Sequence, residues 1–514
     1  MKITYFLDFP FSVGGANKVL LLQAYIMKSR GHDVMVVIPN DKDQKHALEY
    51  DVLCREYGIC AVTAQYSIST CTEGIDILSS IEQYDKIYDL IKKEGPDLVC
   101  SAQINVAVEM AARELKIPHL MNIYQTDQDS FRIKWLDVYP HYHSADSELF
   151  SEMWGKGLHI HSKCIRVAYE KRKQVIRREK ENKDLIHILS IGAFYERKNQ
   201  LEIIQFILKC KNDGMQVRLV FLGNDSSAYG DICKQFVCEN ELEEYVKFKG
   251  FVHNVEDYFC NADLMILASK VESYPGVIVE SIANHVPVLT TPVAGVPELM
   301  KDGYNCLALQ GYESDDIYAA FKRYMVFRNE NKIQDIIRNA DTTFKENHTC
   351  AIVGNKLEDY YTWILQDYKS RYICKEEIKK LFNGFIENKI LNGADSYTKC
   401  NIWFLYHIDQ IVKQKKPQKV IIWGAGYFGK IVLEWLTIIN CIKQFAGFID
   451  VKKKGEYLTY PILGQEEIEN CDLLFVAVSD LNSRLDIMNY LEEHGMKRNE
   501  TYFMAINSPI SILF

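Results

Sequence analysis

The chain has 514 residues, and 60 Lys and Arg against 69 Asp and Glu give it a formal net charge of −9. Hydrophobic residues make up 48% and charged residues 25%, a globular balance that excludes a mainly disordered chain, a collagen-like fibre and a small disulfide-stapled protein. At roughly 150 residues per domain this length predicts about three domains, and the acidic balance argues against a nucleic-acid partner.

The 15 cysteines are scattered, and no two of them have the C-x-x-C spacing. A zinc site needs paired ligands at short spacing, so no metal site is predicted. An odd number of thiols in a large chain fits buried, reduced cysteines. No apolar run approaches the ~18 residues that span a bilayer, and the N-terminal stretch ITYFL is too short for a signal-peptide core. We therefore expect a cytoplasmic, soluble protein.

The first block, residues 1–168, alternates strand and helix patterns. KITYFLDF predicts a strand, SVGGANK predicts a loop that contains Gly14 and Gly15, and VLLLQAYIMKSRG predicts a helix. HDVMVVIP, DLVCS and HLMNIYQ predict further strands. This alternation indicates a parallel sheet of the Rossmann type.

The second block, residues 169–345, opens with YEKRKQVIRREKENKD (169–184), a polar and mostly basic run. We interpret this run as a solvated connection between domains, with contact to a membrane surface as the alternative. LIHILSIG, VRLVFLG, VKFKGF, DLMILAS and VPVLTT then predict strands between helices. Residues 346–416 predict a helical return and a linker, without strand alternation.

The last block, residues 417–514, is a third, smaller Rossmann-like domain by its pattern. KVIIWGAGYFGKIVLEWL places Gly424, Gly426 and Gly429 between a predicted strand and a predicted helix, and Asp450 ends the next strand 24 residues after Gly426. This is the dinucleotide-binding pattern, with the acid placed for a ribose hydroxyl. A nucleotide or NAD site and a purely structural or oligomerising role are both open for this block.

The segment LASKVESYPGVIVESIANHVPVLTTPVAGVPELMKDG (267–303) contains the pattern with the most chemistry. A predicted strand ends in a loop that bears Glu272, and Pro and Gly then begin a helix whose first amides are unsatisfied. Such a helix start is suited to a diphosphate. Glu280 lies in the first turns of that helix, and ionised carboxylates are strong acceptors for sugar hydroxyls.

Glu272-x7-Glu280, followed by PVLTTPVAGVPELMKDG, resembles the retaining group 1 glycosyltransferases of GT-B fold. GGANK, IGAFYERKNQ and KGFVHNVEDYFCNADLMILAS resemble further segments of that family, in the expected order. The resemblance covers roughly residues 1–370 and implies an acceptor-side and a donor-binding Rossmann-like domain that face each other. In the last block, GFIDVKKKGEYLTYPILG resembles the nucleotide-sugar-binding domain of bacterial sugar acyltransferases.

The resemblance implies a role for each matching residue. Glu272 would accept hydrogen bonds from the transferred sugar, and Glu280 from the nucleotide ribose. Lys198 matches the family's phosphate-binding lysine, and Arg197 would replace the arginine that the family commonly has where Ala193 stands. The remaining implied donor-lining residues are Gly14, Gly15, Ser273, Tyr274, Gly276 and Val277.

The implied function is a retaining, hexosyltransferase-type transfer from a nucleotide-sugar to a glycan or lipid-linked acceptor in cell-surface polysaccharide biosynthesis. The family's proposed front-face route lets the leaving phosphate help deprotonate the acceptor. No metal or cofactor is expected for transfer, since the most closely matched region, residues 185–310, has no D-x-D-like metal motif beside a strand end. A nucleotide-sugar isomerase on the same fold and an inactive nucleotide-binding scaffold are the alternatives.

The acceptor side departs from the family pattern. Tyr124 and Gln125 stand where the family often has His-Asp, with Asp127 close by. A lipid-linked acceptor would bring the protein into peripheral contact with the inner face of the membrane. The oligomeric state is not predicted.

Overall fold

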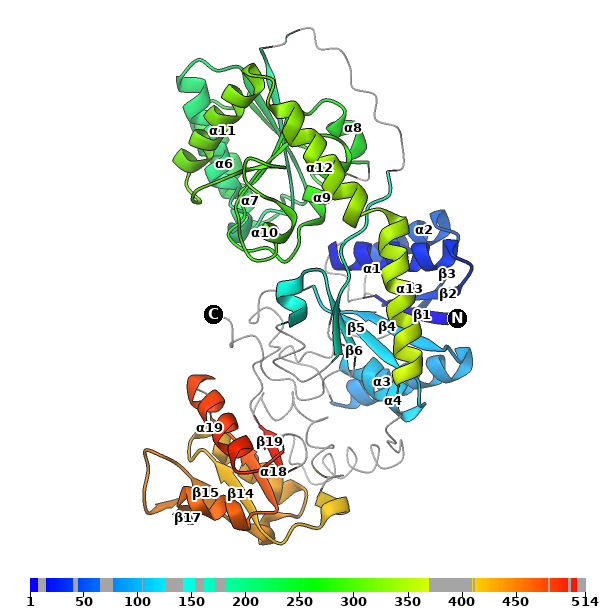
Figure 1. Cartoon of the computed structure of the whole chain (residues 1–514), viewed down its shortest axis with the longest axis vertical. Coiled ribbons are helices and arrows are strands. Elements are labelled where there is room, and N and C mark those ends of the chain that lie inside the picture. The colour runs from blue at the N-terminus through cyan, green and yellow to red at the C-terminus, as the bar shows by residue number, and fades with distance from the viewer. Residues whose placement is uncertain are drawn as a thin grey trace.

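The fold is given by a computed structural model for residues 1–7, 15–39, 45–64, 77–103, 105–124, 142–152, 161–171, 182, 184–252, 254–368, 409, 412–478, 481–497 and 501–505. Within these ranges the strands form three sheets, one for each block of the sequence, and each sheet is accompanied by helices (Figure 1). The predicted α/β class is confirmed.

The N-terminal sheet is parallel and has the order β3-β2-β1-β4-β5-β6-β7. Its strands are β1 (Lys2–Phe6), β2 (Asp33–Pro39), β3 (Cys60–Ala64), β4 (Leu98–Ala102), β5 (His119–Asn122), β6 (Tyr142–Ala145) and β7 (His161–Cys164). Its helices are α1 (Gly15–Ser29), α2 (Lys45–Glu56), α3 (Ile77–Glu94) and α4 (Val106–Glu114).

The sequence did not predict β3, β6 or β7. These strands read CAVTA, YHSA and HSKC, which are short and lack the continuous β-branched runs that mark strands in a sequence. By contrast β1, β2, β4 and β5 are buried along nearly their whole length, as strands covered on both faces are, and they read as apolar runs.

A buried polar network connects β4, β5 and α4. His119 lies 2.7 Å from Glu109 through Nδ1 and 2.8 Å from Ser101 Oγ through Nε2, and Arg113 donates to Glu109 at 2.5 Å. Burial alone would raise the pKa of Glu109, but the charge of Arg113 and the hydrogen bond from His119 outweigh it and lower that pKa. Because Ser101 is completely buried, this serine–histidine–glutamate arrangement stabilises the domain and offers no nucleophile to a substrate.

The second sheet is also parallel, in the order β10-β9-β8-β11-β12-β13. Its strands are β8 (Ile186–Ile191), β9 (Val217–Leu222), β10 (Val246–Phe248), β11 (Leu264–Leu267), β12 (Val288–Thr290) and β13 (Leu307–Ala308). Its helices are α6 (Gln200–Asn212), α7 (Ala228–Glu239), α8 (Glu256–Phe259), α9 (Gly276–Ala283), α10 (Val296–Leu299), α11 (Ser314–Asn329) and α12 (Ile333–Asn347). The strand order reverses between β8 and β11, and ligands of such sheets bind in the crevice beyond the carboxyl ends of the strands at that point.

Helix α13 (Cys350–Asp367) follows the second domain in sequence but packs on the first, beside α1 (Figure 1). Tyr361 of α13 is fully buried and lies 3.3 Å from the Tyr5 hydroxyl, and Arg30 donates to Glu358 at 2.6 Å. The chain therefore crosses between these two domains twice.

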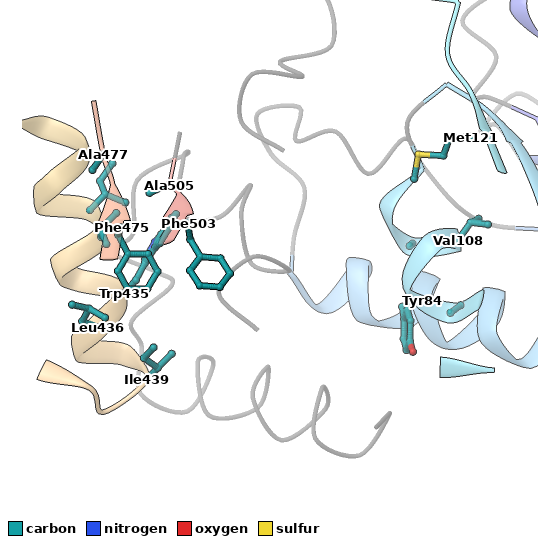
Figure 2. Packing of buried hydrophobic residues seen from close by; sticks show 14 of the residues in the cluster. Tyr84, Val108, Met121, Trp435, Leu436, Ile439, Phe475, Ala477, Phe503 and Ala505 are labelled. Atoms are coloured by element: carbon teal, nitrogen blue, oxygen red, sulfur yellow. The ribbon is translucent and has the colours of Figure 1, made fainter. Parts of the chain in front are cut away.

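The C-terminal sheet has the order β16-β17-β15-β14-β18-β19, and it is mixed because β16 and β17 form an antiparallel hairpin. Its strands are β14 (Val420–Trp423), β15 (Phe445–Ile449), β16 (Glu456–Tyr457), β17 (Tyr460–Leu463), β18 (Leu473–Val476) and β19 (Tyr502–Met504), and its helices include α18 (Tyr427–Ile438) and α19 (Leu481–Glu493). Figure 2 shows Trp435 of α18 beside Phe475 and Phe503 of the sheet, in the part of the module's core that lies on the α18 face.

No helix in the described part of the chain combines the length and apolarity needed to cross a membrane.

Candidate functional site

The crevice between β8 and β11 brings together two of the predicted site residues. Lys198 ends a short 3-10 helix, η2 (Glu196–Lys198), in the loop after β8, and Glu272 lies in the loop after β11. The ammonium group of Lys198 forms an ion pair with the carboxylate of Glu272. Glu272 is buried, with only 6% of its surface exposed. The sequence had given these residues separate roles; the structure shows that each orients the other at the edge of the crevice.

The two loops are held together by further contacts. The amide of Lys270 donates to the carbonyl of Arg197 at 2.7 Å, and the Arg197 guanidinium lies 3.4 Å from the carbonyl of Val271. Asn199, in a left-handed conformation at φ 62°, directly precedes α6 and donates to the Tyr312 carbonyl at 2.6 Å. Arg197 is thus beside the Glu272 loop, but its guanidinium contacts backbone and is exposed, so its role as a substitute phosphate cation stays a prediction.

The start of α9 faces the same crevice. Pro275 precedes the helix and supplies no side-chain hydrogen bond to it, and Gly276 and Val277 are its first residues. A Cβ at Gly276 would lie in ordinary van der Waals contact with Val167 of the opposite domain, at 3.6 Å. Amides at the start of a helix that has no cap are suited to negatively charged oxygens.

Tyr274 anchors the loop that leads into α9. Its hydroxyl lies 3.1 Å from His348 Nε2, and the Arg166 guanidinium stacks on its ring at 4.8 Å. The Tyr274 side chain is buried, and these contacts fix the loop from the side of the opposite domain.

Glu280, on α9, is half-buried, and its carboxylate has no hydrogen-bond or ion-pair partner among the described residues. Burial raises the pKa of Glu280 to about 7; the charge of Lys18, from the opposite domain, opposes the shift, and the charge of Glu256 adds to it. An unpartnered carboxylate of this kind is free to accept hydrogen bonds from the hydroxyls of a ligand.

Several polar residues around Glu280 were not predicted from the sequence. Tyr169 donates to Glu256 at 2.9 Å, and Asn284 contacts both the Tyr169 hydroxyl at 3.3 Å and the Glu280 carbonyl at 2.8 Å. Lys18 lies over the ring of Phe251 at 5.2 Å. Lys18, Glu256 and Asn284 lie in segments whose resemblance to the family had been noted, but no role had been given to any of these residues, and Tyr169 lies in the basic run.

The N-terminal glycine loop is only partly placed. Gly15 is the first residue of α1, is exposed, and has open space around its Cα, whereas Gly14 lies outside the described residues. On the acceptor side, Tyr124 accepts a hydrogen bond from Gln23 at 3.2 Å, and its amide donates to Gln103 at 3.3 Å. Gln125 and Asp127 also lie outside the described residues.

In the C-terminal module, Asp450 binds the glycine loop itself. One carboxylate oxygen accepts from the Ala425 amide at 2.9 Å, and the other accepts from the amides of Lys452 at 2.9 Å and Lys453 at 3.0 Å. The predicted ribose contact of Asp450 therefore competes with hydrogen bonds that already hold the loop in shape.

The three glycines of this loop differ in what they do. Gly424 has φ +120°, and a side chain there would lie 2.6 Å from the Ala477 carbonyl; a side chain at Gly429 would overlap the carbonyl of Gly424. Gly426 has an ordinary φ of −127° and nothing within 4 Å of a side chain built on it. Close packing in the fold therefore requires glycine at positions 424 and 429. Gly426 is not required by packing, and the space beside it is open.

Comparisons with known proteins agree with this geometry. Residues 171–343 match the model of the group 1 glycosyl transferases, and residues 419–491 match that of the PglD N-terminal domain. The GPI3 subunit of phosphatidylinositol N-acetylglucosaminyltransferase from Saccharomyces cerevisiae is 26% identical over 155 residues, covering 30% of this chain and 34% of that protein. N-acetyl-alpha-D-glucosaminyl L-malate synthase from Bacillus anthracis is 27% identical over 191 residues, covering 37% and 47%. The chain thus spans between a third and a half of the length of these relatives.

Among solved structures, HepE of Anabaena in complex with UDP and glucose aligns with a TM-score of 0.58 and 17% identity, over 70% of this chain and 99% of that one. This similarity confirms the predicted GT-B fold for the first two domains. The middle of the chain is therefore similar in sequence to the group 1 glycosyl transferases, and its C-terminal part is similar to the PglD N-terminal domain.

Proposed function

We propose that this protein is a retaining glycosyltransferase that moves a hexose from a nucleotide-sugar to a glycan or lipid-linked acceptor in cell-surface polysaccharide biosynthesis. The observation that supports it most is the placement of Lys198, Glu272 and the start of α9 together at the strand-order reversal of the donor domain. A cation, a buried carboxylate and a free helix start at one edge suit the diphosphate and the sugar of such a donor.

The same groups suggest how the transfer proceeds. As the bond between the sugar and the diphosphate breaks, Lys198 and the first amides of α9 stabilise the negative charge that develops on the diphosphate. Glu272 holds sugar hydroxyls, and Glu280 holds the ribose. The acceptor hydroxyl forms the new bond on the face that the diphosphate leaves, and its proton passes to a diphosphate oxygen. This route uses no metal and no cofactor.

The identity of the donor and acceptor classes is supported by the similar proteins. The aligned HepE structure contains UDP and glucose, which favours a UDP-sugar donor here. The relative from yeast is named for transfer to phosphatidylinositol, which favours a lipid-linked acceptor and hence peripheral contact with a membrane.

The proposal predicts that the purified full-length chain releases nucleoside diphosphate from at least one donor in a panel of UDP-, GDP- and ADP-sugars. With a crude lipid-linked glycan fraction from the source cells, NMR of the product should show the anomeric configuration of the donor. An inverted product would refute retention. Epimerised sugar formed without acceptor would favour the isomerase, and donor binding without any turnover would favour the inactive scaffold.

For the C-terminal module we propose a second nucleotide or nucleotide-sugar site above the loop of Gly424, Gly426 and Gly429, with NAD as the alternative ligand. The support is the open space at Gly426, where neither the backbone conformation nor the packing requires a glycine. In the motif, the glycine at this position lets a pyrophosphate approach the backbone closely.

Gly426→Val is therefore expected to abolish this second binding event and to leave the melting temperature unchanged. Gly429→Val should instead destabilise the module, because its side chain would overlap the Gly424 carbonyl. Calorimetric titration with UDP-sugars and NAD, in a Glu280→Ala background that weakens the donor site, resolves the second site. Unchanged ligand binding in Gly426→Val would show that the loop is structural.

A further inference from the structure

Two carboxylates connect the acceptor-side and donor domains just beyond β6, and they point in opposite directions across the boundary. The first is Asp146, at the end of β6, which accepts a hydrogen bond from Ser273 Oγ of the donor domain at 2.5 Å. Only 4% of Asp146 is exposed. Burial raises the pKa of Asp146 to about 7, and the bond from Ser273 and the charge of Arg166 oppose the shift. Removing the Ser273 hydroxyl would thus take from a buried acid the side-chain donor that reaches it from the opposite domain.

The second carboxylate is Glu298 of α10, on the donor domain. It accepts hydrogen bonds from the amides of Glu148 at 2.8 Å and Leu149 at 2.9 Å, both in the opposite domain. Arg166, also from that domain, donates to the same carboxylate at 2.6 Å. Glu298 therefore holds the two domains together through three bonds.

The backbone at this boundary is packed too closely for any side chain at Gly295. A Cβ there would overlap the carbonyl oxygen of Ser273 and would lie 3.0 Å from Ser147 Cβ of the opposite domain. Ser273 is thus held in two ways: its carbonyl packs closely against the backbone of Gly295, and its hydroxyl donates to Asp146.

We propose that Asp146 is a positioning residue for sugar transfer: from the opposite domain it holds Ser273, and with it the neighbouring Glu272, in the geometry that faces the donor. The inference rests on the proposed function and extends it to the acceptor-side domain. Glu298 holds the two domains together but forms no hydrogen bond with residues 269–275 in the described structure. Contact between the domains and positioning of the 269–275 loop therefore depend on different carboxylates.

The expected effect follows from how the loop is built. Ser273 and Glu272 are adjacent, so losing the anchor at Ser273 lets the Glu272 carboxylate move relative to the sugar. A displacement of about 1 Å at a reacting centre costs on the order of 100-fold in rate, and partial loosening should cost less. The loss should appear in kcat more than in the KM for the donor, because Lys198, Glu280 and α9 still bind the nucleotide.

The test is a double-mutant cycle in the full-length chain, with kcat and KM measured for the donor that turns over. Asp146→Ala and Ser273→Ala should each lower kcat roughly 10-fold and change KM less than about twofold, and the double variant should be no slower than the slower single one. Asp146→Asn should recover most of the rate, because its amide oxygen still accepts from Ser273. Multiplied losses in the double variant, or wild-type kcat in Asp146→Ala, would overturn the proposal.

Hydrogen–deuterium exchange separates this proposal from the proposed function, because it needs no turnover. The amides of residues 269–276 should exchange faster in Asp146→Ala and Ser273→Ala than in the wild-type chain, and at the wild-type rate in Asp146→Asn. Unchanged exchange in both alanine variants would refute the positioning role even if the enzyme is active. Faster exchange in a chain that releases no nucleotide would uphold the loop anchor while the function fails.

Discussion

Replacing Lys198 with Ala is expected to lower kcat for the donor by about 100- to 1,000-fold, the range seen when one preorganised group that stabilises developing charge is removed. Lys198 pairs directly with Glu272, so the substitution removes the cation beside the diphosphate and also leaves a buried carboxylate without its counter-charge. Steady-state release of nucleoside diphosphate measures the effect.

Lys209→Ala is the matched control, because Lys209 belongs to the same domain and pairs with Asp315 on the surface at 2.6 Å. It should keep kcat within about twofold, since exposed ion pairs contribute little. Lys198→Arg keeps the positive charge, and its kcat should lie between those of Lys198→Ala and Lys209→Ala. A Lys198→Ala variant that keeps its melting temperature and more than a third of wild-type kcat would show that Lys198 is not the diphosphate cation.

The second large effect is expected at Glu280. Glu280→Gln should weaken the affinity for UDP-glucose by about 10-fold at pH 8, because a hydrogen bond to a charged group is worth about 1.5–3 kcal/mol and one to a neutral amide oxygen about 0.5–1.5 kcal/mol. The pKa of Glu280 is raised to about 7, so the wild-type carboxylate becomes protonated as the pH falls through this value. Wild-type affinity should therefore decline from pH 8 to pH 6 and approach that of the variant, whose affinity should stay flat.

The raised pKa of Glu280 has the opposite effect on the stability of the unliganded protein, which decreases as the pH rises. A carboxyl whose folded pKa lies above its unfolded value favours the folded state at low pH, and this contribution is lost as the pH rises through about 7.

Calorimetry with UDP-glucose, which has no terminal phosphate to titrate in this range, measures how the affinity depends on pH. Glu239→Gln, on the exposed end of α7, is the control and should keep the wild-type profile. A wild-type affinity that does not change between pH 8 and pH 6 would contradict the role given to Glu280.

The sequence predicted the parts of the fold that are encoded locally. The apolar runs of β1, β2, β4, β8, β9 and β11 correspond to buried parallel strands, and the Pro-Gly step before Glu280 corresponds to the start of α9. Strands β6 and β7 were missed because YHSA and HSKC are short and polar. β6 is buried through its neighbours in the sheet, whereas β7, at the sheet edge, stays largely accessible.

The candidate site was predictable only in its donor half. Lys198, Glu272 and Glu280 stand out because they lie in segments that resemble a family. Asp146 does not, because its partner Ser273 is 127 residues away and the pairing exists only once the two domains meet. Asp450 lies where the motif predicts, and the structure adds that its oxygens accept hydrogen bonds from the amides of Ala425, Lys452 and Lys453; its contact with a ribose stays a prediction.

A structure of the full-length chain with UDP-glucose bound would test the proposed donor site most directly. The diphosphate should lie within hydrogen-bond distance of Lys198 Nζ and the first amides of α9, with the ribose hydroxyls on Glu280. A nucleotide seated away from the crevice between β8 and β11, or a ribose that does not contact Glu280, would contradict the assignment.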